Sequence, residues 1–118
     1  MSAPDALVEL RERVRQFAAE RDWFQFHAPK NLAIALSVEA AELLEHFQWL
    51  SEDASRRLGA DELGKVREEL ADVLIYLVRL ADELGVDLAA AARDKLAANA
   101  RRYPVDTARG SSQKSTVP

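Results

Sequence analysis

Residues 38–49, VEAAELLEHFQW, carry the clearest structural signal in this chain of 118 residues. Their apolar side chains recur at steps of three and four residues, which is the period of an amphipathic helix. A second stretch, ELADVLIY at residues 69–76, has the same period. Alternating runs rich in β-branched residues, which are typical of strands, are missing from the sequence. The sequence therefore predicts an all-α protein without a sheet.

Helix start and stop signals extend this pattern in both directions. The first helix is expected to begin at a capping box near Ser2 to Asp5 and to fade near Arg21. Gly85 suits the left-handed conformation that closes a helix, and Asp87 can cap the helix that follows. We expect a four-helix bundle, with helices at about residues 5–21, 30–50, 61–84 and 87–102.

The segments between and after these helices have distinct compositions. Residues 22–29 read as an aromatic loop, because Pro29 disfavours a helical conformation in the residue before it. Residues 51–60 read as a weakly helical linker. Residues 105–118 have hardly any apolar side chains and cannot offset the entropy of ordering with a core of their own. The sequence predicts one helical domain, residues 1–104, followed by a flexible polar tail, residues 105–118.

The composition argues against several classes of function. The 20 acidic and 16 basic residues give a formal net charge of -4, and no basic stripe offers a site for a nucleic-acid polymer. The chain has no cysteine, so it has no disulfide framework and no thiolate metal site. No apolar stretch approaches the roughly 18 residues of a membrane span, and residues 1–12 lack an apolar leader. We expect a cytoplasmic protein with neither a membrane nor a nucleic-acid polymer as partner.

Four carboxylates lie where the core of a helical protein should be. Glu39 falls inside the apolar stripe of its helix, with Glu42 beside it. Glu69 and Asp72 repeat this arrangement on the third helix. If the two stripes pack on each other, the four like charges converge, and this requires raised pKa values or a bound cation. Because the donors are all oxygen atoms, the expected ion is Mg²⁺, or Mn²⁺, rather than zinc.

Two other interpretations of these acids are a solvated helix face and a di-iron site. A single E-x-x-E pair most often lies on a solvated helix face, but two pairs inside apolar stripes favour a metal site. A di-iron bundle requires Glu-x-x-His pairs. The residues three positions before His27 and His46 are Phe24 and Leu43, so the sequence does not support a di-iron site.

Aromatic and basic residues elsewhere in the chain could bind a nucleotide. Aromatic faces stack on nucleobases, and the candidates are Trp23, Phe26, His27 and Trp49. The candidates for phosphate contacts are Lys30, Arg79, Lys95, Asn99, Arg101 and Arg102. Taken singly, such residues are more typical of a core, or of helix C-termini where cations interact with the dipole. Together with a metal held by acids, they favour a nucleoside triphosphate as substrate.

These residues resemble the all-α nucleoside triphosphate pyrophosphohydrolases of the MazG-like superfamily, and within it the dCTP pyrophosphatase branch. The resemblance covers about residues 5–110. Besides the two helical stretches quoted above, it rests on RDWFQFH at 21–27, PKNL at 29–32, and the segment from Lys95 through Asn99 to RYP at 102–104. It implies a homotetramer, or at least a homodimer, of helical bundles. It also implies hydrolysis of a nucleoside triphosphate to the monophosphate and pyrophosphate with Mg²⁺.

The resemblance also implies roles for individual residues. The catalytic metal ligands would be Glu39, Glu42, Glu69 and Asp72. The residues that contact the nucleotide would be Trp23, Phe26, His27, Lys30, Asn31, Trp49, Tyr76, Lys95, Asn99 and Arg102.

Two positions depart from the pattern that the resemblance implies. Many superfamily members have a glutamate where this chain has Val38, so the group that activates water stays open. The dCTP branch has a histidine where this chain has Val14, which leaves the preferred base and sugar open, with dCTP and a modified pyrimidine analogue among the candidates. The rival hypothesis is a non-catalytic helical binding or scaffold protein. Such a protein should not depend on divalent ions for its stability.

Overall fold

The computed structural model describes residues 5–116, and every regular element within them is helical. The all-α prediction is therefore confirmed. In chain order, the elements are α1 (Ala6–Glu20), the short 3₁₀ helix η1 (Phe24–Phe26), α2 (Pro29–Glu45), α3 (Glu52–Ser55), α4 (Ala60–Leu84), α5 (Leu88–Arg102) and α6 (Val105–Ala108).

Local signals explain how α1 begins and how the aromatic loop follows it. The Asp5 carboxylate accepts the backbone N–H of Leu7 at 2.8 Å, which caps α1. Ser2, the start of the predicted capping box, lies outside the described residues. Asp22 then has a φ of 54°, in the left-handed region, so the chain turns sharply into η1. The predicted loop is thus a tight aromatic turn, and it ends where Pro29 opens α2.

The C-terminal end of α2 differs from the prediction. The helix ends at Glu45, five residues before the predicted end at Leu50. Residues 46–50 instead form turns, in which the N–H of Leu50 bonds to the carbonyl of Phe47 at 2.9 Å. Ser51 then takes an extended conformation and caps α3 through its hydroxyl. The predicted helix therefore runs five residues too far, and turns replace its last part.

The predicted ends of the later helices agree closely with the structure. α4 ends at Gly85, whose φ of 68° lies in the left-handed region that glycine enters without strain. The Asp87 side chain accepts the N–H of Ala90 and caps α5.

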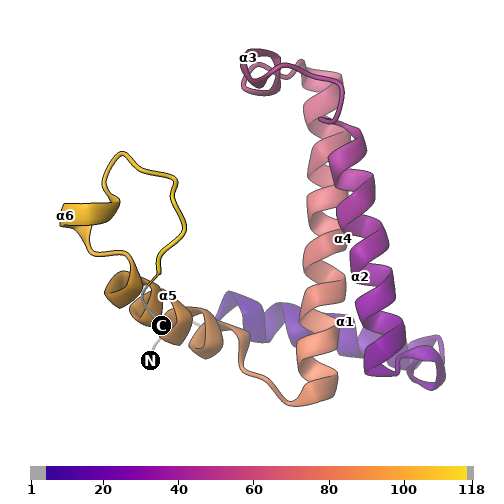
Figure 1. Ribbon diagram of the computed structural model, residues 1–118. Coiled ribbons are helices and arrows are strands. Elements are labelled where there is room, and N and C mark those ends of the chain that lie inside the picture. Colours follow the sequence, from indigo (N-terminus) through magenta and orange to yellow (C-terminus); the bar gives the residue numbers. More distant parts are fainter. Residues whose placement is uncertain (1–4, 117–118) are drawn as a thin grey trace. The chain divides into compact units, whose positions relative to one another are not determined.

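The described residues fall into two compact units that divide after Gly85. In the first unit, α2 packs side by side with α4, and α1 also packs against α4 (Figure 1). An ion pair supports the contact with α1, because the Arg15 Nε donates to Asp82 Oδ2 at 3.0 Å. The apolar side chains buried in this unit are Ala18, Leu32, Val66, Val78 and Ala81.

The second unit contains α5, α6 and the segment that follows them. This segment returns to the end of α5, where the backbone N–H of Ser115 donates to the Tyr103 hydroxyl at 3.1 Å. The turn of helix in α6 lies inside the segment predicted as a tail, and helical periodicity did not indicate so short an element. The boundary at residue 104 and the flexibility of the tail stay predictions.

Among residues 5–116, no helix combines the length and the apolar character that crossing a membrane requires.

Candidate functional site

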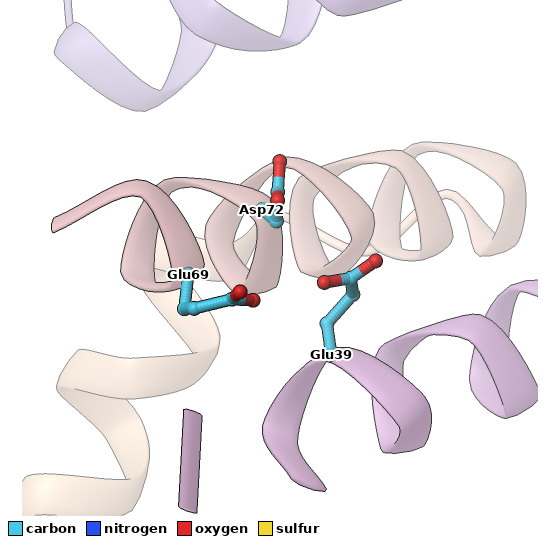
Figure 2. Close-up of side chains that lie close together, drawn as sticks. All are labelled: Glu39, Glu69 and Asp72. Carbon is cyan, nitrogen blue, oxygen red and sulfur yellow. The ribbon is translucent and has the colours of Figure 1, made fainter. Parts of the chain in front are cut away.

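An acidic cluster lies between the two longest helices of the first unit. Glu39 comes from α2, whereas Glu69 and Asp72 come from successive turns of α4 (Figure 2). One carboxylate oxygen from each residue lies within 4.8 Å of the other two. The cluster exists because the apolar stripes of α2 and α4 pack on each other and bring their embedded acids together.

The carboxylates of this cluster have unusual electrostatics. Oε2 of Glu39 and Oε2 of Glu69 are both buried and have no hydrogen-bond partner among residues 5–116. Burial, followed by a hydrogen bond with Glu42 and the charges of the neighbouring acids, raises the pKa of Glu39 to about 7. Burial is also the main cause that raises the pKa of Glu69. These acids are therefore held in surroundings that disfavour their charged form.

Two further side chains border the cluster. Glu42 is not part of the set of three, but its charge and a hydrogen bond raise the pKa values of both Glu39 and Glu69. His46 lies at the end of α2, with its Nε2 at 3.9 Å from Glu69 Oε1. Its effect on the pKa of Glu69 is opposite in sign and smaller than that of burial.

The donor set of the cluster fits a hard divalent cation. Mg²⁺ binds oxygen ligands at about 2.0 to 2.1 Å, so ligands on opposite sides of the ion are about 4.2 Å apart. No separation in the cluster exceeds 4.8 Å, so small side-chain rotations would suffice to bring the oxygens around one ion. A cation would also give the two orphaned oxygens a partner, which the described part of the chain does not provide.

An apolar cavity of about 260 Å³ adjoins the acidic cluster. Asp72 belongs to both, since it lines this cavity and contributes to the cluster. The volume is slightly below the roughly 300 to 1,000 Å³ of small-molecule sites, which suits one ring system better than a whole nucleotide. The lining residues are Val14, Phe17, Ala18, Trp23, His27, Asp72, Ile75, Tyr76 and Arg79.

Aromatic contacts hold the wall of the cavity that comes from the turn after α1. The Trp23 ring meets the Phe17 ring edge to face, with centroids 5.6 Å apart, and it meets the His27 ring at 6.4 Å. The side-chain amide of Asn31 donates to the Phe26 carbonyl at 3.1 Å and so fixes the end of the turn. Asn31, predicted to contact the nucleotide, thus has a structural bond in this position.

The structure brings together some of the predicted nucleotide-binding residues and leaves others apart. Trp23, His27 and Tyr76 line the cavity. Phe26 and Trp49 are not among the lining residues, and 60% and 88% of their surfaces are exposed. Because α2 ends at Glu45, the prediction that Trp49 lies on this helix is wrong.

The predicted phosphate contacts are spread over both units. Lys30 is exposed near the start of α2. Lys95, Asn99 and Arg102 lie on α5 in the second unit, where Lys95 is exposed and the other two are half-buried. Arg79 is only 4% exposed, donates to His27 and Glu83, and lines the cavity.

Sequence reasoning missed part of the cavity wall. It did not assign Phe17, Ala18 or Ile75 to the binding site, although all three line the cavity. A signal was present for Phe17, because the apolar stripe of α1 leads directly into the aromatic turn. The contact between Arg79 and His27, 52 residues apart in the sequence, has no sequence signal.

Comparisons with known proteins agree with this architecture. The model of the MazG-like family matches residues 34–116. Human dCTP pyrophosphatase 1 is 47% identical over 117 residues, which cover 98% of this chain and 69% of the human protein. The bovine dCTP pyrophosphatase 1 is 46% identical over the same length.

A solved structure supports the same assignment. The crystal structure of a pyrophosphatase from Archaeoglobus fulgidus DSM 4304 superposes with a TM-score of 0.77 at 41% sequence identity. The match covers 88% of this chain and 97% of the archaeal one. With a family model over most of its length, and close relatives in sequence and fold, the chain belongs to the MazG-like family.

Proposed function

We propose that this protein is a nucleoside triphosphate pyrophosphohydrolase that cleaves its substrate to the monophosphate and pyrophosphate with Mg²⁺. The observation that carries the proposal is the position of Asp72, which belongs to the acidic cluster and also lines the aromatic cavity. A nucleotide with its base in the cavity would have its phosphates next to the cluster. The family and the names of the dCTP-hydrolysing relatives support the same reaction.

The acids on α2 and α4 would hold the metal. Glu39, Glu69 and Asp72 are the proposed ligands, with Glu42 as a fourth carboxylate at the edge of the set. When bound, Mg²⁺, or Mn²⁺ in its place, supplies charge neutralisation at the phosphates and orients a water molecule for attack on the α-phosphorus. The chain's own part is to keep these carboxylates preorganised on two packed helices. No side chain is assigned as general base, because position 38 is valine.

The aromatic cavity would hold the base. Trp23 and Tyr76 offer flat faces for stacking, and His27 offers a polar group at the same wall. Val14 makes the α1 side of the cavity apolar. A pyrimidine suits the volume, so we propose dCTP or a modified pyrimidine analogue as the substrate.

We further propose that the protein acts as a homodimer or homotetramer in the cytoplasm. Large apolar side chains on α2 and α4 are exposed in the single chain, and burying them against another copy would be favourable. They include Ile34, Val38, Leu70, Leu74 and Leu77. Assembly would also give exposed candidates such as Trp49 and Lys95 a way to reach a nucleotide.

The proposal is tested by measuring pyrophosphate release from a panel of ribo- and deoxynucleoside triphosphates, with Mg²⁺ and then with a chelator. The expected result is chelator-sensitive release of pyrophosphate together with the monophosphate, fastest with a pyrimidine deoxynucleotide. If folded protein supplied with Mg²⁺ releases no pyrophosphate from any nucleotide of the panel, the proposed enzymatic activity is contradicted and a non-catalytic scaffold is favoured.

A further inference from the structure

A buried arginine, Arg79, forms a hydrogen bond with His27 at the wall of the cavity. Arg79, on α4, is 4% exposed, and its guanidinium makes contacts on several sides. Its Nε donates to His27 Nδ1 at 3.0 Å, and one terminal nitrogen donates to Glu83 Oε2 at 2.6 Å. The guanidinium carbon also lies 4.6 Å from the centre of the Phe24 ring, where a cation–π contact forms.

This contact determines which nitrogen of His27 carries the proton. A guanidinium is only a donor, so the Nδ1 that it faces must be an unprotonated acceptor. A neutral imidazole with an unprotonated Nδ1 carries its proton on Nε2. Protonation of both nitrogens would set an N–H of the ring against the N–H of Arg79. His27 is therefore a neutral Nε2–H tautomer.

The surroundings of His27 agree with this state. Desolvation, helped by the charge of Arg79, lowers the pKa of His27, although Glu83 acts in the opposite direction. The rings of Trp23 and Phe24 lie edge-on to the imidazole at centroid distances of 6.4 and 6.5 Å and limit its rotation. The neighbouring carboxylate of Asp82 forms ion pairs with both Arg15 and Arg79.

We infer that Arg79 is a positioning residue for base recognition: by keeping Nδ1 of His27 unprotonated, it makes His27 an N–H donor at the wall of the cavity. The group that this donor selects is a nucleobase with a hydrogen-bond acceptor on the edge that meets His27, such as a ring carbonyl or an unprotonated ring nitrogen. The inference rests on the proposed function, because it assigns the cavity to the base. It adds a determinant of specificity that acts through His27.

The tautomer can be measured without any substrate. Long-range proton–nitrogen correlation spectra of the His27 ring distinguish a protonated Nε2 from a protonated Nδ1. Wild-type protein should show the Nε2–H pattern. Arg79→Met, which keeps an unbranched apolar chain but removes the donor, should show a mixture of tautomers. Arg79→Lys keeps a group that can only donate, so it should retain the Nε2–H pattern. This variant keeps the test decisive if Arg79→Met does not fold.

Kinetics with dCTP give the second readout. In Arg79→Met, the KM for dCTP should rise about tenfold, which corresponds to about 1.4 kcal/mol of binding free energy. The kcat should change less than about twofold, because the metal ligands are not altered. Arg15→Met is the matched control, since it removes one positive charge and one partner of Asp82 but does not contact His27. Its KM and its His27 spectrum should equal those of the wild type.

The outcomes separate this inference from the proposed function. Wild-type turnover of dCTP tests the function alone. A protonated Nδ1 in the wild type or in Arg79→Lys would overturn the inference even in an active enzyme. So would a KM in folded Arg79→Met that matches the Arg15→Met control. A wild type that shows the Nε2–H pattern but hydrolyses no nucleotide would refute the proposed function, on which the specificity role of Arg79 rests, and would leave the tautomer assignment standing.

Discussion

Replacing Glu39 by glutamine should remove most of the stabilisation that Mg²⁺ gives to this protein. The substitution keeps the size of the side chain but removes one of the three carboxylates whose oxygens lie within 4.8 Å of one another. Without metal, the variant should be at least as stable as the wild type, because it removes a like charge and an orphaned carboxylate oxygen. With metal, it should lose most of the stabilisation, because the site lacks one ligand.

The expected size follows from linkage and chain length. At a concentration about 100 times its Kd, a ligand that binds only the folded state adds about 2.7 kcal/mol to the free energy of unfolding. An unfolding entropy of about 2.1 cal/mol/K per residue gives about 0.25 kcal/mol/K for 118 residues. The wild-type Tm should therefore rise by about 11 °C. If the substitution weakens binding about 100-fold, the same concentration should raise the variant's Tm by less than about 2 °C.

The assay is thermal unfolding followed by circular dichroism, with chelator and then with increasing Mg²⁺. Glu45→Gln is the control, because Glu45 lies on the same helix but is exposed and outside the cluster. It should show the full rise in Tm. An equal rise in Glu39→Gln and in the wild type would refute the assignment of Glu39 as a metal ligand. A fall in the metal-free Tm of the variant would refute the argument from like charges.

Three further predictions concern other parts of the first unit. The pKa of Glu39 is raised from 4.5 to about 7, so between these pH values Glu39 is neutral in the folded protein but ionised in the unfolded chain. The metal-free wild type should therefore lose stability relative to Glu39→Gln as the pH rises from 4.5 to about 7. Denaturant titrations across this pH range would show the loss. Leu32→Ala removes a side chain of α2 that is only 1% exposed, and it should lower the free energy of unfolding by about 2 to 5 kcal/mol. A loss below about 1 kcal/mol in urea unfolding would contradict its place in the core. Trp49→Ala should raise the KM for the nucleotide more than it changes the Kd for Mg²⁺; equal losses in kinetics and in metal titration would give Trp49 a structural role.

The sequence predicted those features that depend on short-range chemistry. Gly85 and Asp87 mark the end of α4 and the start of α5, because a left-handed glycine and a capping carboxylate act within one helical turn. The convergence of Glu39 with Glu69 and Asp72 could also be predicted, since acids embedded in two apolar stripes must meet when the stripes pack.

Features that depend on how distant segments of the chain pack against each other, or on competing helix ends, could not be predicted from the sequence. The helical period of residues 46–50 continues that of α2, but the helix ends at Glu45 and the chain passes through turns to a new cap at Ser51, so Trp49 does not lie on α2. The role of Arg79 was also missed, because a basic residue on a helix gives no sign that it will be buried against His27.

The position of bond cleavage is the sharpest test of the proposed reaction. Hydrolysis of dCTP with Mg²⁺ in water enriched in heavy oxygen, followed by mass spectrometry of both products, shows which phosphorus the water attacks. Attack on the α-phosphorus predicts the label in the monophosphate and none in the pyrophosphate. Label in the pyrophosphate, or release of orthophosphate instead, would contradict a pyrophosphohydrolase built on this acidic cluster.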